Sequence, residues 1–211
     1  MMLAGAGMTS LACGGEETST QYVGPPVVAG CEIRPGARCV DVDLTRVDLR
    51  NADLTGADLT GADLYLTDLR GATLTDAVLR DASAQGVNLK GATLDGADLT
   101  GADLRAVELD GATAVGALFD GASMYKANMS GVDFSGSSMV EAVLYESNAR
   151  GSRFVEVDLS GADLNFAELE DTDFTGAVVV GTRFVGVDFT SSVLTGVDLS
   201  GANTNSAKLP G

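Results

Sequence analysis

The sequence contains no histidine and no tryptophan, and aromatic residues make up only 5% of its 211 positions. Without histidine, the chain lacks the most frequent general base, the commonest metal ligand and the side chain that titrates near neutral pH. The scarcity of large rings also argues against a conventional core built on aromatic packing. These absences favour a scaffold over an enzyme.

Basic residues are scarce as well. Thirteen lysines and arginines face 30 aspartates and glutamates, which gives a formal net charge of −17. Such a charge argues against direct binding to nucleic-acid phosphates or to an anionic membrane surface. No apolar run approaches the roughly 18 residues that indicate a transmembrane helix. Yet 45% of the residues are hydrophobic, which is too many for a disordered chain.

What the chain does have is a period of five residues. Steps of five from Cys39 to Leu209 visit 35 central positions, which hold 20 Leu, six Phe, three Met and one Val. The residue two places before a central position is always Ala, Val, Ser or Thr, and the residue two places after it is Gly in 20 of the 35 cases. The register is unbroken over residues 37–211.

A period of five fits neither an α-helix nor a simple strand. It fits a square coil in which each pentad forms one side, with the central residue and the small residue two places before it pointing inward. Four pentads close a turn of about 20 residues, and turns stack at roughly 4.8 Å. The 35 pentads therefore predict a solenoid of between eight and nine coils, a rod about 42 Å long.

This register predicts specific core positions. One inward column should contain Leu54, Leu74 and Leu94. An internal aromatic stack, rather than a ligand site, is expected from Phe134, Phe154 and Phe174. Looser packing is expected where alanine takes a central position, at Ala84, Ala114 and Ala149.

Individual pentads resemble a known motif. Residues 52–56, 57–61 and 97–101 all read Ala-Asp-Leu-Thr-Gly and match the A(D/N)LXX signature of the pentapeptide-repeat proteins. The resemblance covers residues 37–211. It implies an all-β fold, a right-handed quadrilateral β-helix.

Residues 1–21 form an apparent leader and polar tether. The run Leu11-Ala12-Cys13-Gly14 resembles the end of a bacterial lipoprotein signal, which implies acylation of Cys13, export and attachment to the cell envelope without a transmembrane span. Ser10 and the lack of a basic segment depart from that pattern. The alternatives are a disordered Gly/Ala-rich tail with an incidental cysteine, and a cytoplasmic protein.

Residues 22–36 are expected to cap the open first coil, whose core and strand edges are otherwise exposed. Cys31 and Cys39 flank a turn at Arg34-Pro35-Gly36, and an exported protein would permit a disulfide between them. The alternative is two buried thiols. No cap follows the last pentad, so a homodimer through the C-terminal coil is a further prediction.

The four sides of the coil differ in charge. Counted from the pentad 37–41, acids and bases number 8 and 2 on the first side, 5 and 4 on the second, 8 and 5 on the third, and 6 and 1 on the fourth. The adjoining fourth and first sides form an acidic edge with a net charge of −11, since 14 acids face 3 bases. The nearly neutral second side presents Tyr65, Tyr125, Tyr145 and Phe166.

Two functions follow from these surfaces. The preferred one is a non-catalytic interaction or structural protein, exported and associated with the envelope, that binds an unidentified protein partner through the second side. The alternative comes from the resemblance, because some family members mimic DNA, bind type II topoisomerases such as gyrase and confer quinolone resistance. That function would use acidic-edge residues, namely Asp53, Asp58, Asp95, Asp98, Asp133 and Asp158.

No catalytic, cofactor or metal site is expected. The glycines obey the period of five and form no separate phosphate loop, and the Asp-rich runs lack the spacing and terminal Glu of a Ca²⁺ loop.

Overall fold

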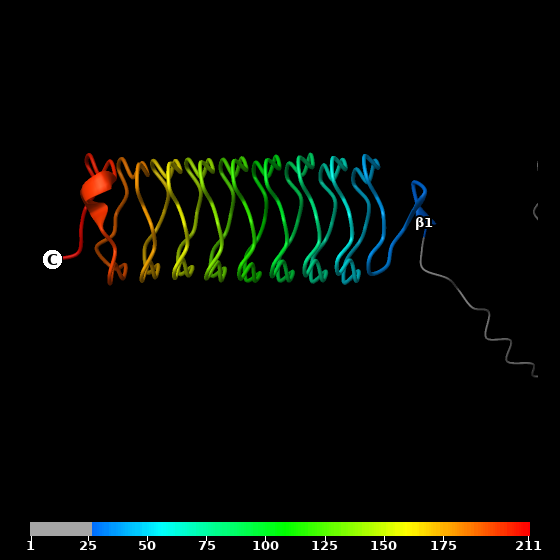
Figure 1. Ribbon diagram of the computed structural model, residues 1–211, viewed down its shortest axis with the longest axis horizontal. Helices are drawn as coiled ribbons and strands as arrows, with labels where there is room; N and C mark the ends of the chain where they lie inside the picture. Colours follow the sequence, from blue (N-terminus) through cyan, green and yellow to red (C-terminus); the bar gives the residue numbers. More distant parts are fainter. Residues whose placement is uncertain (1–26) are drawn as a thin grey trace, which may run out of the picture.

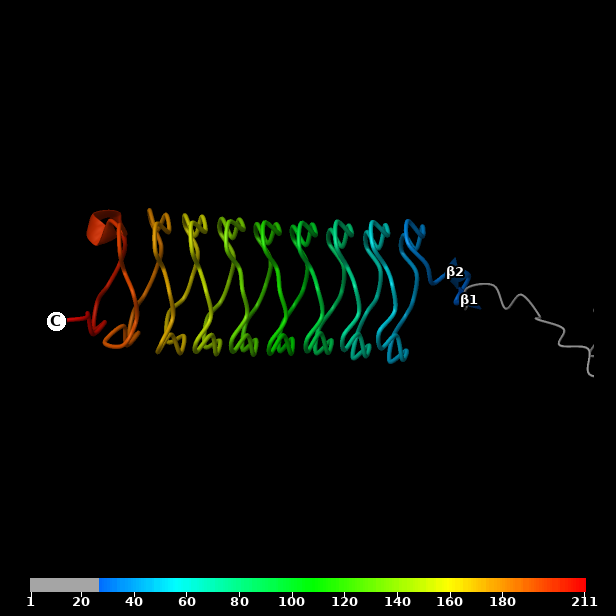
Figure 2. The same cartoon turned by 90° about the horizontal axis from the view of Figure 1, so that it is seen from below.

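The computed structural model describes residues 27–211, which form a rod of stacked coils (Figures 1 and 2). The elements in this part of the chain are β1 (Val27–Val28), β2 (Cys31–Glu32) and the 3₁₀ turn η1 (Leu199–Gly201). The predicted leader, with Cys13, lies outside the described residues, as do residues 22–26 of the predicted cap. The coils themselves are built from single-residue bridges rather than long strands.

Parallel bridges join residues 20 positions apart, as from Arg38 to Asp58 and from Asp58 to Val78. Central residues up to Leu164 donate their N–H to a carbonyl one coil further along, as when Leu59 donates to Val78 at 2.7 Å. This regular ladder satisfies backbone groups that would otherwise be buried without partners. The 20-residue quadrilateral coil is therefore confirmed.

Each side ends in a turn that needs a left-handed backbone. In every coil up to Gly186 the residue two places after the central position has positive φ whether it is glycine or not, as at Gly56 (62°) and Phe166 (58°); Ser191 and Gly201, near the C-terminal end, do not. Glycine dominates these positions because it adopts positive φ without steric cost.

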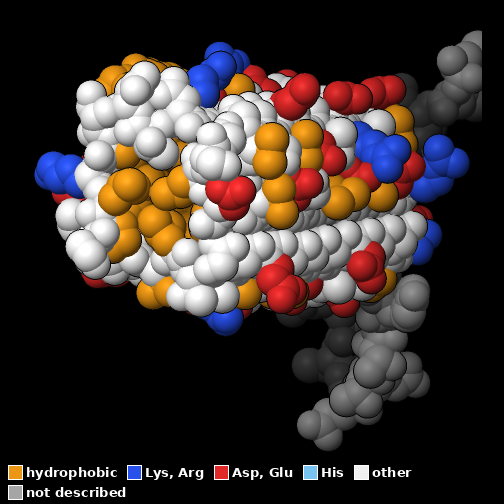
Figure 3. Space-filling model, turned by 60° about the vertical axis from the view of Figure 1, so that its left-hand side comes forward, with side chains coloured by type: hydrophobic (Ala, Val, Ile, Leu, Met, Phe, Trp, Pro, Cys, Tyr) orange, Lys and Arg blue, Asp and Glu red, His pale blue; other side chains and the backbone are white. Residues whose placement is uncertain are grey.

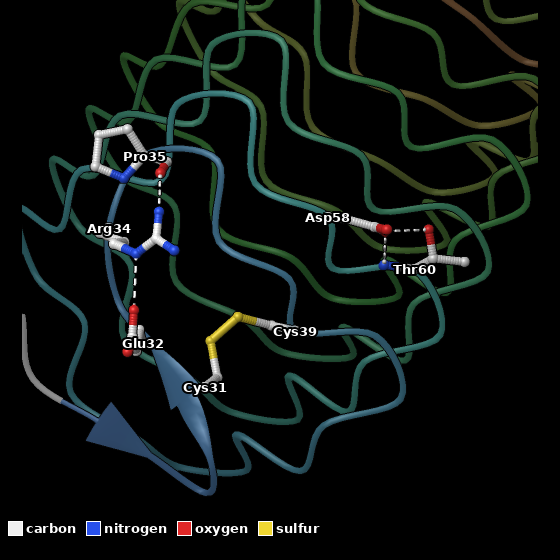
Figure 4. The surroundings of a disulfide bond; sticks show 7 residues. All are labelled: Cys31, Glu32, Arg34, Pro35, Cys39, Asp58 and Thr60. Atoms are coloured by element: carbon white, nitrogen blue, oxygen red, sulfur yellow. Dashed lines mark hydrogen bonds and ion pairs between the residues drawn. A yellow bond between two sulfur atoms is a disulfide. The ribbon is translucent and has the colours of Figure 1, made fainter.

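An aspartate before the central position often braces the same turn. The Asp58 carboxylate accepts the N–H of Thr60 at 3.2 Å and its hydroxyl at 2.7 Å (Figure 4). Such Asx turns are a structural reason for the aspartates of the repeat, independent of any role in binding.

The core is a continuous column of inward side chains. Leu54, Leu74 and Leu94 are fully buried, as the register predicts. The ring of Phe154 stacks between two others, with centroids 5.2 Å from Phe134 and 4.9 Å from Phe174. The internal aromatic stack is thus part of the core. The alanines at central positions are also fully buried: Ala84, Ala114 and Ala149.

The N-terminal end is closed by a hairpin. Strands β1 and β2 pair antiparallel, with Val28 opposite Cys31. A disulfide joins Cys31 to Cys39, with Cα atoms 5.2 Å apart, and both residues are buried (Figure 4). The hairpin is therefore covalently tied to the first coil.

The C-terminal end is open. Leu194 and Leu199 occupy central positions but are only partly buried, and Leu209, expected to point inward, is 48% exposed. These central residues are incompletely enclosed because no further coil packs on them, which agrees with the uncapped last pentad expected from the sequence. Hydrophobic side chains accordingly gather at this end of the rod (Figure 3).

Candidate interaction surfaces

Three rings on the second side form a surface cluster, named the aromatic face and made of Tyr125, Tyr145 and Phe166, in which the two tyrosines are partly buried and Phe166 is exposed. The two tyrosines are one coil apart and stack with centroids 5.9 Å apart, and Phe166 meets Tyr145 edge to face at 5.6 Å. Phe166 is 51% exposed. The 20-residue coil aligns the tyrosines, and the turn position of Phe166 brings its ring to them.

Neighbouring residues hold these rings in place. The Phe166 ring lies against Gly186, where an added Cβ would sit 2.8 Å from two ring carbons. The Lys126 ammonium lies 5.1 Å from the centre of the Tyr125 ring and 3.4 Å from the Glu146 carboxylate. Because the rings are already fixed, little side-chain entropy remains to be lost on binding.

Tyr65 is not part of this cluster. It lies three coils earlier on the same side, under the Arg46 guanidinium, which is 5.7 Å from the ring centre. Leu66 beside it is exposed and rests against Gly86. The structure thus brings together three of the four second-side residues selected from the sequence and leaves Tyr65 apart.

The acidic edge differs from the rest of the rod in how its carboxylates are paired. Only two of its 14 acids form ion pairs, Asp98 with Arg80 at 2.6 Å and Asp133 with Arg153 at 3.0 Å. On the second and third sides 10 of 13 acids are paired. These are Asp48, Asp68, Asp103, Glu108, Asp110, Glu146, Asp163, Glu168, Glu170 and Asp188. The edge is therefore both the most acidic and the least neutralised surface.

The six aspartates selected on this edge are not equivalent. Asp98 is only 8% exposed. The charges of Asp98 and Asp133 are both neutralised by their ion pairs with arginine. Asp53, Asp58 and Asp158 brace turns through the N–H and hydroxyl two residues on. Asp95 instead accepts the N–H of a residue in the next coil, at 3.0 Å.

Hydrogen bonds also keep part of this edge ionised. The hydroxyl of Thr55 lowers the pKa of Asp53, and the hydroxyl of Thr60 lowers that of Asp58. Hydrogen bonds to a carboxylate favour its charged form. These two groups consequently remain negative at neutral pH.

No group of three or more histidine, cysteine or acidic residues in the described part of the chain is arranged to hold a metal ion. Among residues 27–211, no helix is long and apolar enough to cross a membrane.

Comparisons with known proteins agree with this geometry. A family model described as "Pentapeptide repeats" matches eight copies of its repeat, in overlapping segments that span residues 37–203. The solved structure of HetL, a pentapeptide repeat protein involved in heterocyst differentiation regulation from the cyanobacterium Nostoc sp. Strain PCC 7120, is 26% identical. It aligns over 82% of this chain and 90% of its own, with a TM-score of 0.62.

A second solved structure, QnrB1, is a plasmid-mediated fluoroquinolone resistance protein. It is 20% identical, aligns over 73% of this chain and 82% of its own, and has a TM-score of 0.58, which shows a likeness of fold. No curated protein matches the sequence significantly.

Proposed function

Because this chain belongs to the pentapeptide-repeat family, we propose that it is a non-catalytic binding protein that contacts a protein partner through the aromatic face. Every feature of its core serves to stack coils, and its distinctive chemistry lies on the outer sides. The side chains that differ from coil to coil are therefore the ones that select a partner.

The single observation that carries this proposal is that Tyr145 contacts both Tyr125 and Phe166 on the side with the least net charge. Aromatic residues fixed on a rigid surface supply large contact area, and they dominate binding energy in many interfaces. Isolated exposed apolar residues would carry no such argument, because they are common on any protein surface.

The test compares two double variants. The first replaces Tyr125→Ala and Tyr145→Ala, and the second replaces Asp53→Asn and Asp58→Asn, which keeps an oxygen acceptor at each turn. Proteins cross-linked to the wild type in an envelope extract of the host would be identified by mass spectrometry, and the affinity of the purified partner would then be measured. The tyrosine variant should bind roughly 30-fold more weakly. Equal loss in the aspartate variant would contradict the aromatic face as the binding surface.

We also propose that the protein is exported and anchored by a lipid on Cys13. The support is the buried disulfide between Cys31 and Cys39, since such bonds persist mainly in oxidising compartments. Mass spectrometry of the mature N-terminus from the native host would test this. A diacylated Cys13 is expected, and an intact Met1 in a cytoplasmic fraction would contradict it.

A second candidate function is DNA mimicry directed at a type II topoisomerase. It is favoured by the acidic edge, where 12 of 14 carboxylates have no ion pair, and by the likeness of fold to QnrB1. An array of exposed negative charge of this kind can steer binding to a basic groove. Inhibition of gyrase supercoiling that weakens with salt and is lost in the Asp53→Asn, Asp58→Asn variant would favour it over the aromatic face.

A homodimer through the C-terminal coil is a separate proposal. Its support is the incomplete burial of Leu194, Leu199 and Leu209 at the open end. Sedimentation velocity should show a dimer that Leu209→Asp dissociates, and a wild-type monomer at high protein concentration would contradict it.

A further inference from the structure

A groove of about 270 Å³ opens on the first side near the C-terminal end of the rod. One wall is the extended segment 177–180, and the other includes Asp198 and Gly201 from the last coil. The groove lies where the regular ladder between coils is interrupted on the first side.

The ladder is interrupted on the first side because the last coil turns away at η1, and it resumes on the second side, where Arg183 bridges Asn203. Val178, one coil before Asp198, makes both regular bonds to the coil that precedes it. It donates its N–H to the carbonyl of Val157 at 2.9 Å and accepts the N–H of Leu159 at 2.8 Å. Asp198 is the residue that should pair with Val178 in the same way, but it caps η1 and accepts the N–H of Ser200 instead.

Two backbone groups are left over as a result. Among the described residues, the carbonyl of Ala177 and the N–H of Val179 have no hydrogen-bond partner, although each would bond Asp198 in a regular coil. The next donor on the first side, Gly181, bonds Gly201 at 2.8 Å, one residue beyond the regular partner, so along this side the gap is confined to this place. The unpaired N–H of Val179 and the unpaired carbonyl of Ala177 lie on either side of Val178 in an extended segment. The edge of a β-sheet presents the same pair of groups to a strand that adds to it.

The side chains and charges around the groove restrict what fits it. Val178 and Val180 are 46% and 63% exposed and provide apolar contact. The first side has only two bases, Arg38 and Arg80, both in the first three coils. The part of that side nearest the groove carries only acids: Asp98, Asp120, Glu141, Asp158 and Asp198. A second copy of this chain, with a net charge of −17, is therefore a poorer match than a basic segment.

We propose that this groove binds an extended, basic peptide segment of a partner by strand addition. One peptide residue takes the place that Asp198 vacates, donating its N–H to the Ala177 carbonyl and accepting the N–H of Val179. Apolar side chains of the peptide contact Val178 and Val180, and its lysines or arginines face the acids of the first side. In this mode backbone hydrogen bonds supply affinity, and side-chain contacts and charge supply selectivity. The site is separate from the aromatic face and does not depend on it.

The probe is a blocked, fluorescent pentapeptide, Lys-Val-Lys-Val-Lys, titrated against the full chain. Two matched peptides serve as controls, one N-methylated at its central residue and one with glutamate in place of every lysine. The lysine peptide should bind, N-methylation should weaken it roughly three- to tenfold by removing one hydrogen bond, and the glutamate peptide should not bind. Binding should also protect the Val179 N–H from hydrogen exchange.

Two protein variants locate the site. Val180→Lys places a positive charge at the groove, which repels the lysines of the peptide. The affinity for the lysine peptide should fall at least fivefold. Val193→Lys makes the same change at an exposed valine on the fourth side, outside the groove, and should leave affinity unchanged. Circular dichroism should show both variants folded.

Several results would overturn the proposal. The first is that the lysine peptide does not bind. The second is that the N-methylated or the glutamate peptide binds as tightly as the lysine peptide. The third is that Val193→Lys lowers the affinity as much as Val180→Lys does. Protection of Val179 that grows with protein concentration alone would show that a second copy occupies the groove. None of these outcomes bears on the tyrosine variants that test the aromatic face.

Discussion

The two ends of the rod are built from the same repeat but are finished differently. At the N-terminal end the hairpin of β1 and β2 lies over the first coil, and the central residues Cys39, Leu44, Leu49 and Leu54 are all buried. At the C-terminal end the central leucines of the last coil are partly or largely exposed. A pentad therefore specifies the direction of its side chains, whereas their burial requires a neighbour on both sides.

The coils near the C-terminal end are also less regularly joined to one another. Beyond the gap at Asp198, no bridge joins Glu168 to Asp188 on the third side, although both lie in one column. The rings of Phe174, Phe184 and Phe189 meet edge to face nearby, with centroids 5.1 to 6.3 Å apart. We attribute the opening at Asp188 to this crowding, because bulky side chains packed together displace the backbone.

The largest expected effect contrasts the middle of the rod with its open end. Phe154→Ala should lower the free energy of unfolding by about 3–5 kcal/mol, because it removes a fully buried ring stacked on both faces. The matched truncation Leu209→Ala should cost less than about 1 kcal/mol, because that side chain is half exposed. Urea unfolding measures both, and a loss below about 1 kcal/mol for Phe154→Ala would contradict the enclosed stack.

Removing the disulfide should weaken the closed end. Replacing Cys31 and Cys39 by serine should cost about 2–3 kcal/mol, from the entropy regained by a short loop in the unfolded chain. Hydrogen exchange should rise in the first coil and stay unchanged in the last. A uniform rise along the rod would show that the hairpin supports every coil and not only the first.

Gly186 should be more sensitive than other turn glycines. Gly186→Ala should cost more than the roughly 1–2 kcal/mol expected for an alanine at positive φ, because its Cβ would meet the Phe166 ring. Gly121→Ala is the control, since nothing lies within 4 Å of a Cβ there. Thermal unfolding compares them, and equal losses would show that Phe166 moves aside freely.

Acid should produce the smallest effect, at the open end. Lys208 and Thr190 lower the pKa of Asp188, and the Lys208 ammonium lies 2.7 Å from this carboxylate. A carboxyl whose pKa is lowered on folding adds stability above its unfolded value of about 4 and loses it as pH falls through the folded value. Hydrogen exchange at residues 203–208 should therefore increase as pH falls below about 4, after correction for the intrinsic pH dependence of exchange. The increase should be absent in Asp188→Asn.

Much of this molecule follows from the spacing of residues alone. The inward column at Leu54, Leu74 and Leu94, the stack around Phe154 and the alignment of Tyr125 with Tyr145 all follow once 20 residues make one coil. Each of these depends on positions that are multiples of 20 apart. The repeat of identical local geometry is sufficient to place them.

Contacts between different positions of the repeat could not be predicted in this way. Arg80 neutralises Asp98 across 18 residues, and Phe166 reaches Tyr145 from a turn across 21. The irregular turn at Leu199, with the gap it leaves at Val179, arises in pentads that still match the repeat. The sequence by itself determined the coil and the side on which each residue lies, because both depend only on local chain geometry. The tertiary structure decided which charges are neutralised, which rings meet and where the ladder opens, because these depend on the reach of side chains and on the presence of a neighbouring coil.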